Sequence, residues 1–385
     1  MLRNLLSLPK RLWEALLWEL FRPLGVKKNK VVLQSYYGRG LSDSPGAIAE
    51  ELLKRGGFEL YWVVNGDAAK KTLPEGIKPV KYRSSAFVYH MSTSGFWIDN
   101  ARKTVRKRKK PSQIYLQTWH GFALKRIEKD AEASLDAGYV RAAKADGAIC
   151  DLMISDSAHM TSVYKNSFWF SGEILGIGLP RNDFLVRAGE KEKSEIKRSL
   201  GFGDGDRLAL YAPTFRSDGS LDCYQLDYAA LRRSLGARFG GEWTVLVKLH
   251  SNLEKYADSL RLSDEGVKNL SHYPDIQKLY VASDVLITDY SSVMFDFMLT
   301  SRPCFLFASD VEEYMKDRNF YFALEELPFE LCRDVSSLCR AVEGFDEEAY
   351  LKRLGAFRER CGIVADGEAS KKTVDWMEKK LNDER

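Results

Sequence analysis

The sequence of 385 residues has few of the residues from which disulfides and metal sites are built. Its six cysteines are scattered without a C-x-x-C pair, and Cys150 and Cys304 lie in apolar runs. This pattern predicts buried, reduced thiols and suits a reducing compartment. The five histidines show neither H-x-x-x-H nor H-E-x-x-H spacing. The sequence therefore predicts no structural or catalytic zinc site.

Long hydrophobic runs are also missing. No stretch of about 20 apolar residues and no small-residue cleavage site is present, which argues against a spanning helix or a secretory signal. Residues 1–24 instead place Trp13, Leu16 and Leu17 at helical spacing among lysines and arginines. Such a segment either lies in a membrane surface or packs on its own domain. We expect residues 1–30 to form a membrane-associating amphipathic helix with a basic linker.

A large excess of one charge is absent, because the net charge is only +4. The densest basic run, residues 102–110, contains Arg106, Lys107 and Arg108 without interleaved aromatics. Stacking on bases is therefore not predicted, and we expect no nucleic-acid partner. The run is either a solvated loop or a surface that attracts anionic lipid headgroups or a lipid-linked phosphate. Together with the N-terminal helix it would give two membrane signals.

Strand-like and helix-like segments alternate from Val31 onward, in a chain long enough for two domains. The first series of predicted strands comprises 31–35, 60–64, 95–98, 114–118, 148–154 and 173–176. A polar stretch from Arg187 to Arg207 interrupts the rhythm, and a second series comprises 208–211, 244–249, 285–288 and 304–307. We predict two facing Rossmann-like α/β domains, residues 31–186 and 187–385, with ligands at the carboxyl ends of their strands.

The most informative segment follows the predicted strand 285–288. Thr288, Asp289, Ser291 and Ser292 stand between this strand and a segment of helical spacing. Hydroxyls and unpaired backbone N–H groups at a helix N-terminus accept phosphate. Serine also caps ordinary helices, so both interpretations remain open.

Three further strand ends carry residues suited to phosphate chemistry. His120 is a candidate general base or a structural histidine at a turn. Lys248 and His250 could donate to a phosphate or line a solvated strand end. Arg216, after a proline-containing turn, is a candidate phosphate clamp or a surface arginine.

Several motifs occur together in order: QTWHG with LKRI downstream, GLPRNDFL (178–185), YAPTFR, KLH and DVLITDYSSVMFDF. From about Val31 to Phe322 the chain resembles the CDP-glycerol glycerophosphotransferases of teichoic acid synthesis. The resemblance implies a GT-B type fold that binds the donor nucleotide on its C-terminal domain. It also implies transfer of glycerol phosphate from CDP-glycerol to a hydroxyl of an undecaprenyl-diphosphate-linked glycan, with release of CMP, at the cytoplasmic face of the membrane.

The matched motifs imply roles for individual residues. His120 would be the base on the acceptor hydroxyl, His250 would stabilise the donor diphosphate, and Ser291 and Ser292 would bind it. Arg216 is added on charge and position. Because fixed cationic and dipolar groups could stabilise the transition state, we expect no cofactor and no obligatory metal.

The length resembles that of the shorter, primase-like or single-addition members. The family often has Thr-Pro after WHG, where this chain has Phe122 and Ala123, which leaves the acceptor open. Changes at 318–319 and 327–329 leave the choice between CDP-glycerol and CDP-ribitol open. Two alternative functions stay open. One is that of a GT-B glycosyltransferase that uses a nucleotide-sugar, and the other is that of a non-catalytic protein that binds anionic lipid or nucleic acid.

Overall fold

The computed structural model describes the chain except residues 1–7, 67–72, 104–108, 215, 217–220, 225, 251–252, 254–255, 257–264, 313, 315–318 and 384–385. The chain divides into two compact units. Unit 1 comprises Met1–His120, Ile127–Asp183 and Ile363–Arg385, and unit 2 comprises Gly121–Arg126 and Phe184–Gly362. The division at 183/184 lies near the predicted boundary at 186/187. Two segments differ from the predicted ranges. Residues 121–126 belong to unit 2, although they lie within the predicted domain 31–186, and residues 363–385 belong to unit 1, although they lie within the predicted domain 187–385.

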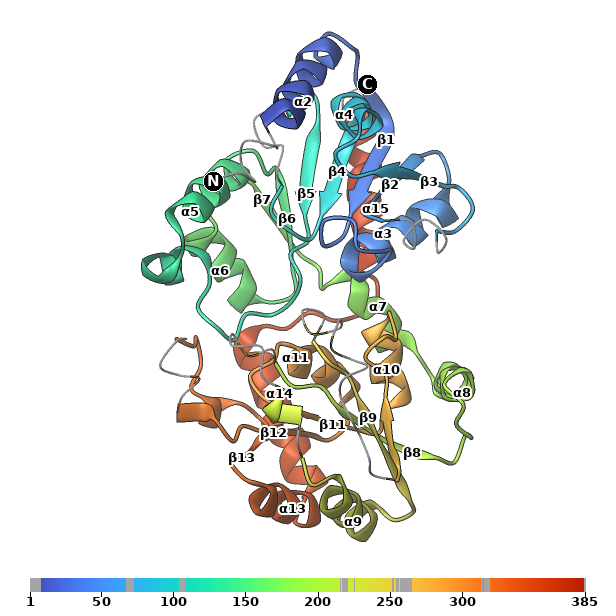
Figure 1. The fold of residues 1–385 in the computed structure, drawn as a ribbon, viewed down its shortest axis with the longest axis vertical. Helices are drawn as coiled ribbons and strands as arrows, with labels where there is room; N and C mark the ends of the chain where they lie inside the picture. Colours follow the sequence, from blue (N-terminus) through green and yellow to red (C-terminus); the bar gives the residue numbers. More distant parts are fainter. Residues whose placement is uncertain are drawn as a thin grey trace. The chain divides into compact units, whose positions relative to one another are not determined.

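Unit 1 contains a seven-stranded sheet in the order β3-β2-β1-β4-β5-β6-β7, with every pair parallel (Figure 1). The strands are β1 (Lys27–Gln34), β2 (Glu59–Val64), β3 (Ile77–Lys81), β4 (Ser94–Asp99), β5 (Ile114–Gln117), β6 (Leu152–Ser155) and β7 (Glu173–Gly176). Central strands are continuous apolar runs because both faces of a parallel sheet are covered by helices. Val31, Val32 and Leu33 of β1 are accordingly fully buried.

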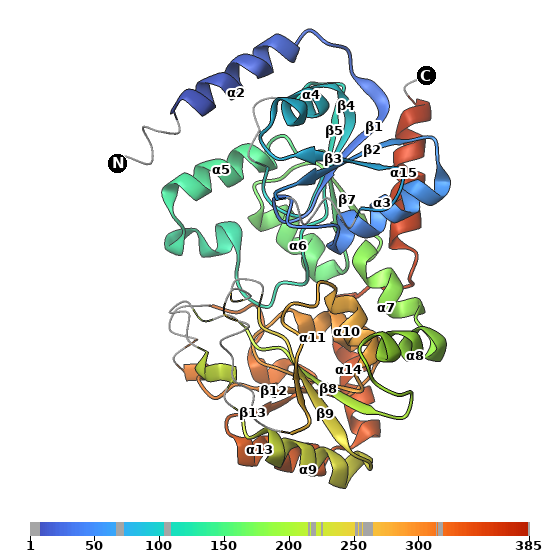
Figure 2. The same ribbon diagram turned by 45° about the vertical axis from the view of Figure 1, so that its right-hand side comes forward.

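Helices surround this sheet. They are α2 (Leu8–Phe21), α3 (Asp43–Arg55), α4 (Ser85–Thr93), η3 (Glu128–Ser134), α5 (Ala137–Gly147), α6 (Ala158–Ser167), η4 (Pro180–Asn182) and α15 (Ala369–Asp383). The last helix, α15, packs beside α3 (Figure 2). Val374 and Met377 enter the core of unit 1, and Arg55 bonds to Asp375 and Glu378. This buried seam places the end of the chain in unit 1.

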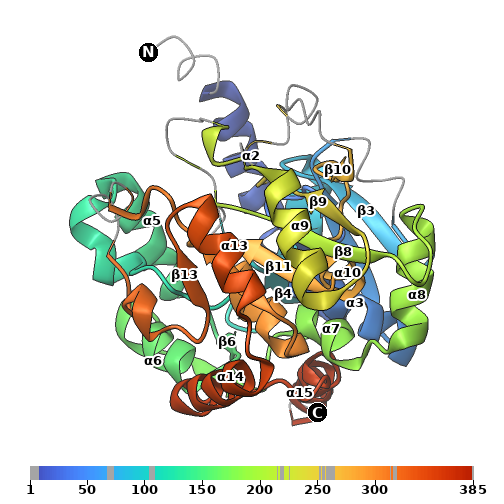
Figure 3. The ribbon, with the colours of Figure 1, turned by 90° about the horizontal axis from the view of Figure 1, so that it is seen from below.

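Unit 2 contains a six-stranded parallel sheet in the order β10-β9-β8-β11-β12-β13. Its strands are β8 (Arg207–Tyr211), β9 (Trp243–Val247), β10 (Val267–Asn269), β11 (Val285–Thr288), β12 (Cys304–Phe307) and β13 (Glu330–Cys332). Its helices are α7 (Asp183–Arg187, from residue 184), α8 (Glu190–Ser199), η5 (Asp222–Tyr224), α9 (Tyr228–Phe239), α10 (Ile276–Ala282), α11 (Val293–Phe297), η7 (Met298–Thr300), η8 (Leu324–Glu326), α13 (Val335–Glu343) and α14 (Glu347–Cys361). Figure 3 shows α9 and α13 side by side on one face.

The short segment 121–126 is built into unit 2. Lys125 forms an antiparallel bridge with Phe320, and the amide of Arg126 donates to the carbonyl of Asn319 at 2.8 Å. Phe122 is buried, with its ring centroid 4.2 Å from that of Phe295 in α11. The departure from the family pattern at Phe122 thus lies in the core of unit 2, behind the Ser291–Ser292 turn.

Candidate functional site

His120 lies at the carboxyl edge of the unit 1 sheet, where the strand order reverses between β1 and β4. Ligands of open α/β sheets bind at such switch points. His120 Nδ1 is 2.8 Å from the carbonyl oxygen of Asn100, the residue after β4. Because a carbonyl only accepts hydrogen bonds, this contact places the proton of the neutral ring on Nδ1. Nε2 then carries the lone pair that a general base requires.

The electrostatic surroundings keep this imidazole neutral near pH 7. Burial lowers the pKa of His120, and the Asn100 contact and the Asp43 carboxylate oppose the shift without reversing it. The ring stacks on Trp119 with centroids 4.1 Å apart. The His120 ring is therefore oriented by these contacts, and its role as a general base stays a prediction.

The turn that presents His120 is fixed by Gln117. Its side-chain amide donates to the carbonyl of Ala101 and the hydroxyl of Tyr115, and its oxygen accepts from the amide of Trp119 at 2.9 Å. Gly121 follows with φ +134°, a conformation that side-chain-bearing residues rarely adopt. The sequence QTWHG thus encodes a rigid strand end.

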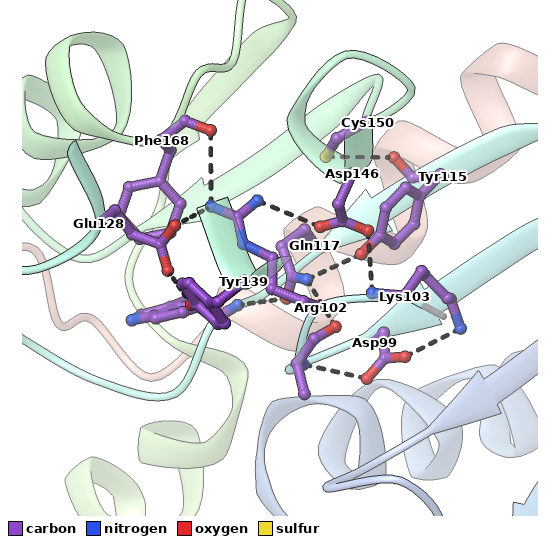
Figure 4. A network of polar contacts seen from close by, with 12 residues as sticks. Asp99, Arg102, Lys103, Tyr115, Gln117, Glu128, Tyr139, Asp146, Cys150 and Phe168 are labelled. Atoms are coloured by element: carbon purple, nitrogen blue, oxygen red, sulfur yellow. Dashed lines mark hydrogen bonds and ion pairs between the residues drawn. The ribbon is translucent and has the colours of Figure 1, made fainter. Parts of the chain in front are cut away.

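The first residues of the basic run are interior and structural (Figure 4). Arg102 pairs with Glu128 at 2.7 Å and with Asp146 at 3.1 Å, and Lys103 pairs with Asp99 at 2.9 Å. Only 7% of the Arg102 side chain is exposed. The expectation of a single solvated or lipid-facing run is therefore wrong for Arg102 and Lys103, because buried carboxylates neutralise them. Arg106, Lys107 and Arg108 lie outside the described residues.

In unit 2 the loops after β8, β9 and β11 share one edge of the sheet, with a strand-order reversal between β8 and β11. Thr288 donates to the carbonyl of Ala212 at 2.8 Å. Asp289 accepts from the amide and hydroxyl of Thr214 and pairs with Arg216 at 2.8 Å. Thr288 and Asp289 are buried and bonded within the protein. These two side chains hold the YAPTFR loop, and binding of substrate at Thr288 and Asp289 stays a prediction.

Arg216 is neither a surface arginine nor an open phosphate clamp in this structure. Besides Asp289, its guanidinium bonds to both carboxylate oxygens of Asp310, at 2.6 and 3.0 Å. It also lies over the rings of Tyr290 and Tyr314. Although burial opposes its charge, Asp310 and Asp289 raise the pKa of Arg216. Phosphate binding by this side chain stays a prediction, and it would require exchange with Asp310.

Lys248 and His250 differ in their settings. The ammonium of Lys248 donates to the carbonyls of Ser271 and Tyr273, whereas the side chain of His250 is exposed. The main-chain amide of His250 donates to the hydroxyl of Tyr224 at 3.1 Å, which ties this loop to the neighbouring one. Direct donation by Lys248 to a phosphate would compete with these carbonyls.

Ser291 and Ser292 precede α11 and are half-buried. The Ser292 side chain makes no capping hydrogen bond to the helix, and the Ser291 hydroxyl is 3.5 Å from the amide of Val293. Side-chain capping therefore accounts for the Ser291 hydroxyl at most, and not for that of Ser292. Their binding of a diphosphate stays a prediction.

The N-terminal helix α2 has two apolar stripes. Leu17 and Trp18 are buried against α4, where Phe21 meets Tyr89 edge to face. Trp13 and Leu16 are 59% and 58% exposed, and Leu12 and Leu20 are exposed to a similar extent. The expectation that Leu17 faces a membrane is therefore wrong, because it packs on its own unit. Among the described residues, no helix is both long and apolar enough to cross a bilayer.

No three His, Cys, Asp or Glu side chains within the described ranges are grouped so that they could hold a metal ion. The independence from metal predicted from the sequence stays a prediction. The cysteines match their prediction more directly, since all six are free and Cys150 and Cys304 are buried.

Comparison with known proteins identifies the family. A family model described as CDP-glycerol:poly(glycerophosphate) glycerophosphotransferase matches residues 15–379. The chain belongs to this glycerophosphotransferase family. The resemblance seen in the motifs is confirmed, as is the fold of two Rossmann-like parallel sheets of the GT-B type.

Individual relatives in this family differ in length. A teichoic acid poly(glycerol phosphate) polymerase of Staphylococcus epidermidis is 32% identical over 93% of this chain and 52% of its own. The chain thus spans about half the length of the first polymerases it matches. A teichoic acid glycerol-phosphate transferase of Staphylococcus aureus is 31% identical over 94% of this chain and 97% of its own. A variant of the wall teichoic acid polymerase TagF, soaked with CDPG, superposes with a TM-score of 0.87 at 29% identity, covering 100% of this chain and 97% of that one.

Four residues of the candidate site were not found from the sequence: Asn100, Asp43, Arg181 and Asp310. Asn100 acts through its main-chain carbonyl, which carries no sequence signal. Arg181 lies within the GLPRNDFL motif, which marked its neighbourhood without indicating a contact, whereas Asp43 is the first residue of α3 and lies in none of these motifs.

Proposed function

We propose that this protein transfers glycerol phosphate from CDP-glycerol to a hydroxyl of a lipid-linked glycan in teichoic acid synthesis and releases CMP. The observation that carries the proposal is the neutral His120, with its proton on Nδ1, in a chain that matches the glycerophosphotransferase family from residue 15 to 379. The relatives of glycerol-phosphate type and the CDPG-soaked TagF variant support CDP-glycerol as the donor.

His120 Nε2 takes the proton of the acceptor hydroxyl, and the oxygen attacks the β-phosphorus in line. The bond from this phosphorus to the CMP oxygen breaks, and CMP leaves with the electron pair. Ser291, Ser292 and His250 stabilise the charge that develops on the diphosphate. Phosphoryl transfer depends mainly on such positioning and charge stabilisation, so the reaction we propose needs no obligatory metal.

The acceptor we propose is carried on a membrane lipid, an undecaprenyl-diphosphate-linked glycan, and the protein works as a peripheral protein at the cytoplasmic face. The exposed stripe of α2, with Trp13 and Leu16, supports this location. Apolar side chains of this kind bind at the headgroup boundary.

The test is a panel of CDP-glycerol and CDP-ribitol against lipid-linked disaccharide acceptors, with CMP release and product mass as readouts. We expect CMP and a glycerol phosphate adduct, formed equally with and without excess EDTA. Ribitol phosphate adducts would show that CDP-ribitol is the donor instead of CDP-glycerol. Release of UDP from a UDP-sugar would indicate a glycosyltransferase. A loss of turnover in EDTA that Mg²⁺ restores would refute metal independence.

His120→Ala should lower turnover about 10² to 10⁴-fold with donor binding largely kept, because proton transfer contributes that much. His90→Ala is the matched control, since α4 leads into the amino end of β4, away from the strand ends that carry the site. Near-normal turnover in His120→Ala would remove His120 from its role.

A further inference from the structure

His120 belongs to a closed ring of hydrogen bonds inside unit 1. Its Nδ1 contacts the carbonyl of Asn100, and the Asn100 side-chain oxygen accepts from the amide of Tyr36 at 2.9 Å. The Tyr36 hydroxyl donates to Asp43 at 2.5 Å, and Arg181 donates to the same oxygen at 3.2 Å. The guanidinium of Arg181 closes the ring by donating to the main-chain carbonyl of His120 at 2.9 Å.

The backbone of this ring is held in unfavourable conformations. Tyr36, Asp43 and Trp119 have φ angles of +43°, +59° and +52°, although none of them is glycine. Such angles persist where the surrounding structure over-determines them, and they gather at functional sites. Tyr36 and Asp43 are members of the ring, and Trp119 directly precedes His120 in the chain.

The ring contains one buried charge of each sign. The side chains of Arg181 and Asp43 are only 9% and 6% exposed. Burial would raise the pKa of Asp43, but Arg181 and the Tyr36 hydroxyl outweigh it and keep the carboxylate ionised. The charged groups that act on His120 are Asp43, Arg181 and Glu128.

We propose that Arg181 and Asp43 are positioning residues for the base: Arg181 fixes the main chain of His120, and Asp43 fixes Arg181. The Asn100 carbonyl then meets Nδ1, and Nε2 is presented to the acceptor hydroxyl. This inference rests on the proposed function only in assigning His120 as the base; the ring itself is independent of it.

The first test follows the imidazole without turnover. Histidine-labelled protein is titrated by NMR, with His120 among the five histidines assigned from a His120→Gln variant. Asp43→Asn removes a negative charge and should lower the pKa of His120, whereas Arg181→Gln removes a positive charge and should raise it. Opposite shifts are specific to direct coupling, because general loosening would move both variants in one direction. Equal or absent shifts would overturn the proposal.

The second test measures turnover with CDP-glycerol. Both variants should lower kcat about 10- to 100-fold with KM for the donor nearly unchanged, since a misplaced base costs rate rather than donor binding. In Asp43→Asn the acid limb of the kcat/KM profile should move to lower pH. Unchanged kcat in both variants would refute the positioning role.

The matched control is Asp284→Asn in unit 2. Asp284 is another carboxylate held in an ion pair, with Lys193 at 2.6 Å, and its side chain is 14% exposed, but it precedes β11 at the amino edge of its sheet. It should change neither the His120 titration nor kcat.

Should Asp43→Asn not fold, Tyr36→Phe removes only the hydroxyl that donates to Asp43. It should lower kcat about 10-fold, the lower end of what a lost hydrogen bond to a charged group costs, and an unchanged kcat would count against the ring. If the wild-type protein released no CMP while the opposite NMR shifts appeared, the proposed function would fail, and only the coupling of Asp43 and Arg181 to His120 would stand.

Discussion

Phe122 illustrates how a single side chain joins the two sequence motifs of this family. It is two residues after His120, yet its ring packs against Phe295, three residues after Ser292. Phe322 and Phe357 complete the cluster in unit 2. A short, buried stretch of chain therefore connects His120 with the aromatic cluster that contains Phe295.

Phe122→Ala should lower the free energy of unfolding of unit 2 by about 3–5 kcal/mol, because it removes a buried ring and leaves a cavity. The measurement is urea unfolding followed by far-UV circular dichroism. Phe239→Ala, which removes a half-buried ring at the end of α9, is the control and should cost less. A loss below about 1 kcal/mol for Phe122→Ala would show that the cluster contributes little.

Charged residues were the hardest to interpret from the sequence. Arg102 and Arg216 stand in basic or strand-end positions that indicate ligand binding, yet both are paired with carboxylates from elsewhere in the chain. A sequence shows where a charged residue lies but not which residue forms an ion pair with it. The carboxylates that pair with Arg102 and Arg216 lie 26 to 94 positions away along the chain. His120 was found because its neighbours form a motif; its Nδ1 partner, a main-chain carbonyl, could not be.

At the scale of elements, the central strands were predictable because burial on both faces demands continuous apolar runs. Three strands were missed: β3, β10 and β13, which lie at the edges of their sheets. Edge strands are half-exposed and carry polar residues, such as IKPVK of β3, in which only Ile77 and Val80 are buried. The predicted strand 148–154 begins only at Leu152, because the residues before it complete the turn after α5.

Helix α2 gives an element-scale prediction. Trp13→Ser with Leu16→Ser should lower sedimentation with anionic phosphatidylglycerol vesicles at least 10-fold, because burying each of these side chains contributes about 1.5–3 kcal/mol. The buried stripe of Leu17 and Trp18 stays intact, so the fold should be kept. Glu19→Ala, an exposed change on the same helix, is the control. Unchanged sedimentation of the double variant would refute the membrane role of α2.

At the scale of the whole molecule, the division into units follows contacts rather than sequence order. The polar stretch near residue 187 marked one point at which the chain passes from one unit to the other. At the other such points, 120/121, 126/127 and 362/363, no change in composition marks the passage. Helix α15 belongs to unit 1 because Val374 and Met377 fit its core. Such a return of the chain depends on long-range packing that local patterns do not encode.

The division into two units predicts which unit binds the product CMP. The loops we assign to the diphosphate, which carry His250 and the Ser291–Ser292 pair, belong to unit 2, whereas the His120 turn belongs to unit 1. In hydrogen exchange read by mass spectrometry, saturating CMP should protect peptides that cover the two unit 2 loops. A ligand at about 100 times its Kd stabilises its site by about 2.7 kcal/mol, so their exchange should slow up to about 100-fold. Ser291→Ala with Ser292→Ala should abolish most of this protection, and His120→Ala should leave it intact. Protection confined to unit 1 would reverse the assignment of donor and acceptor sides.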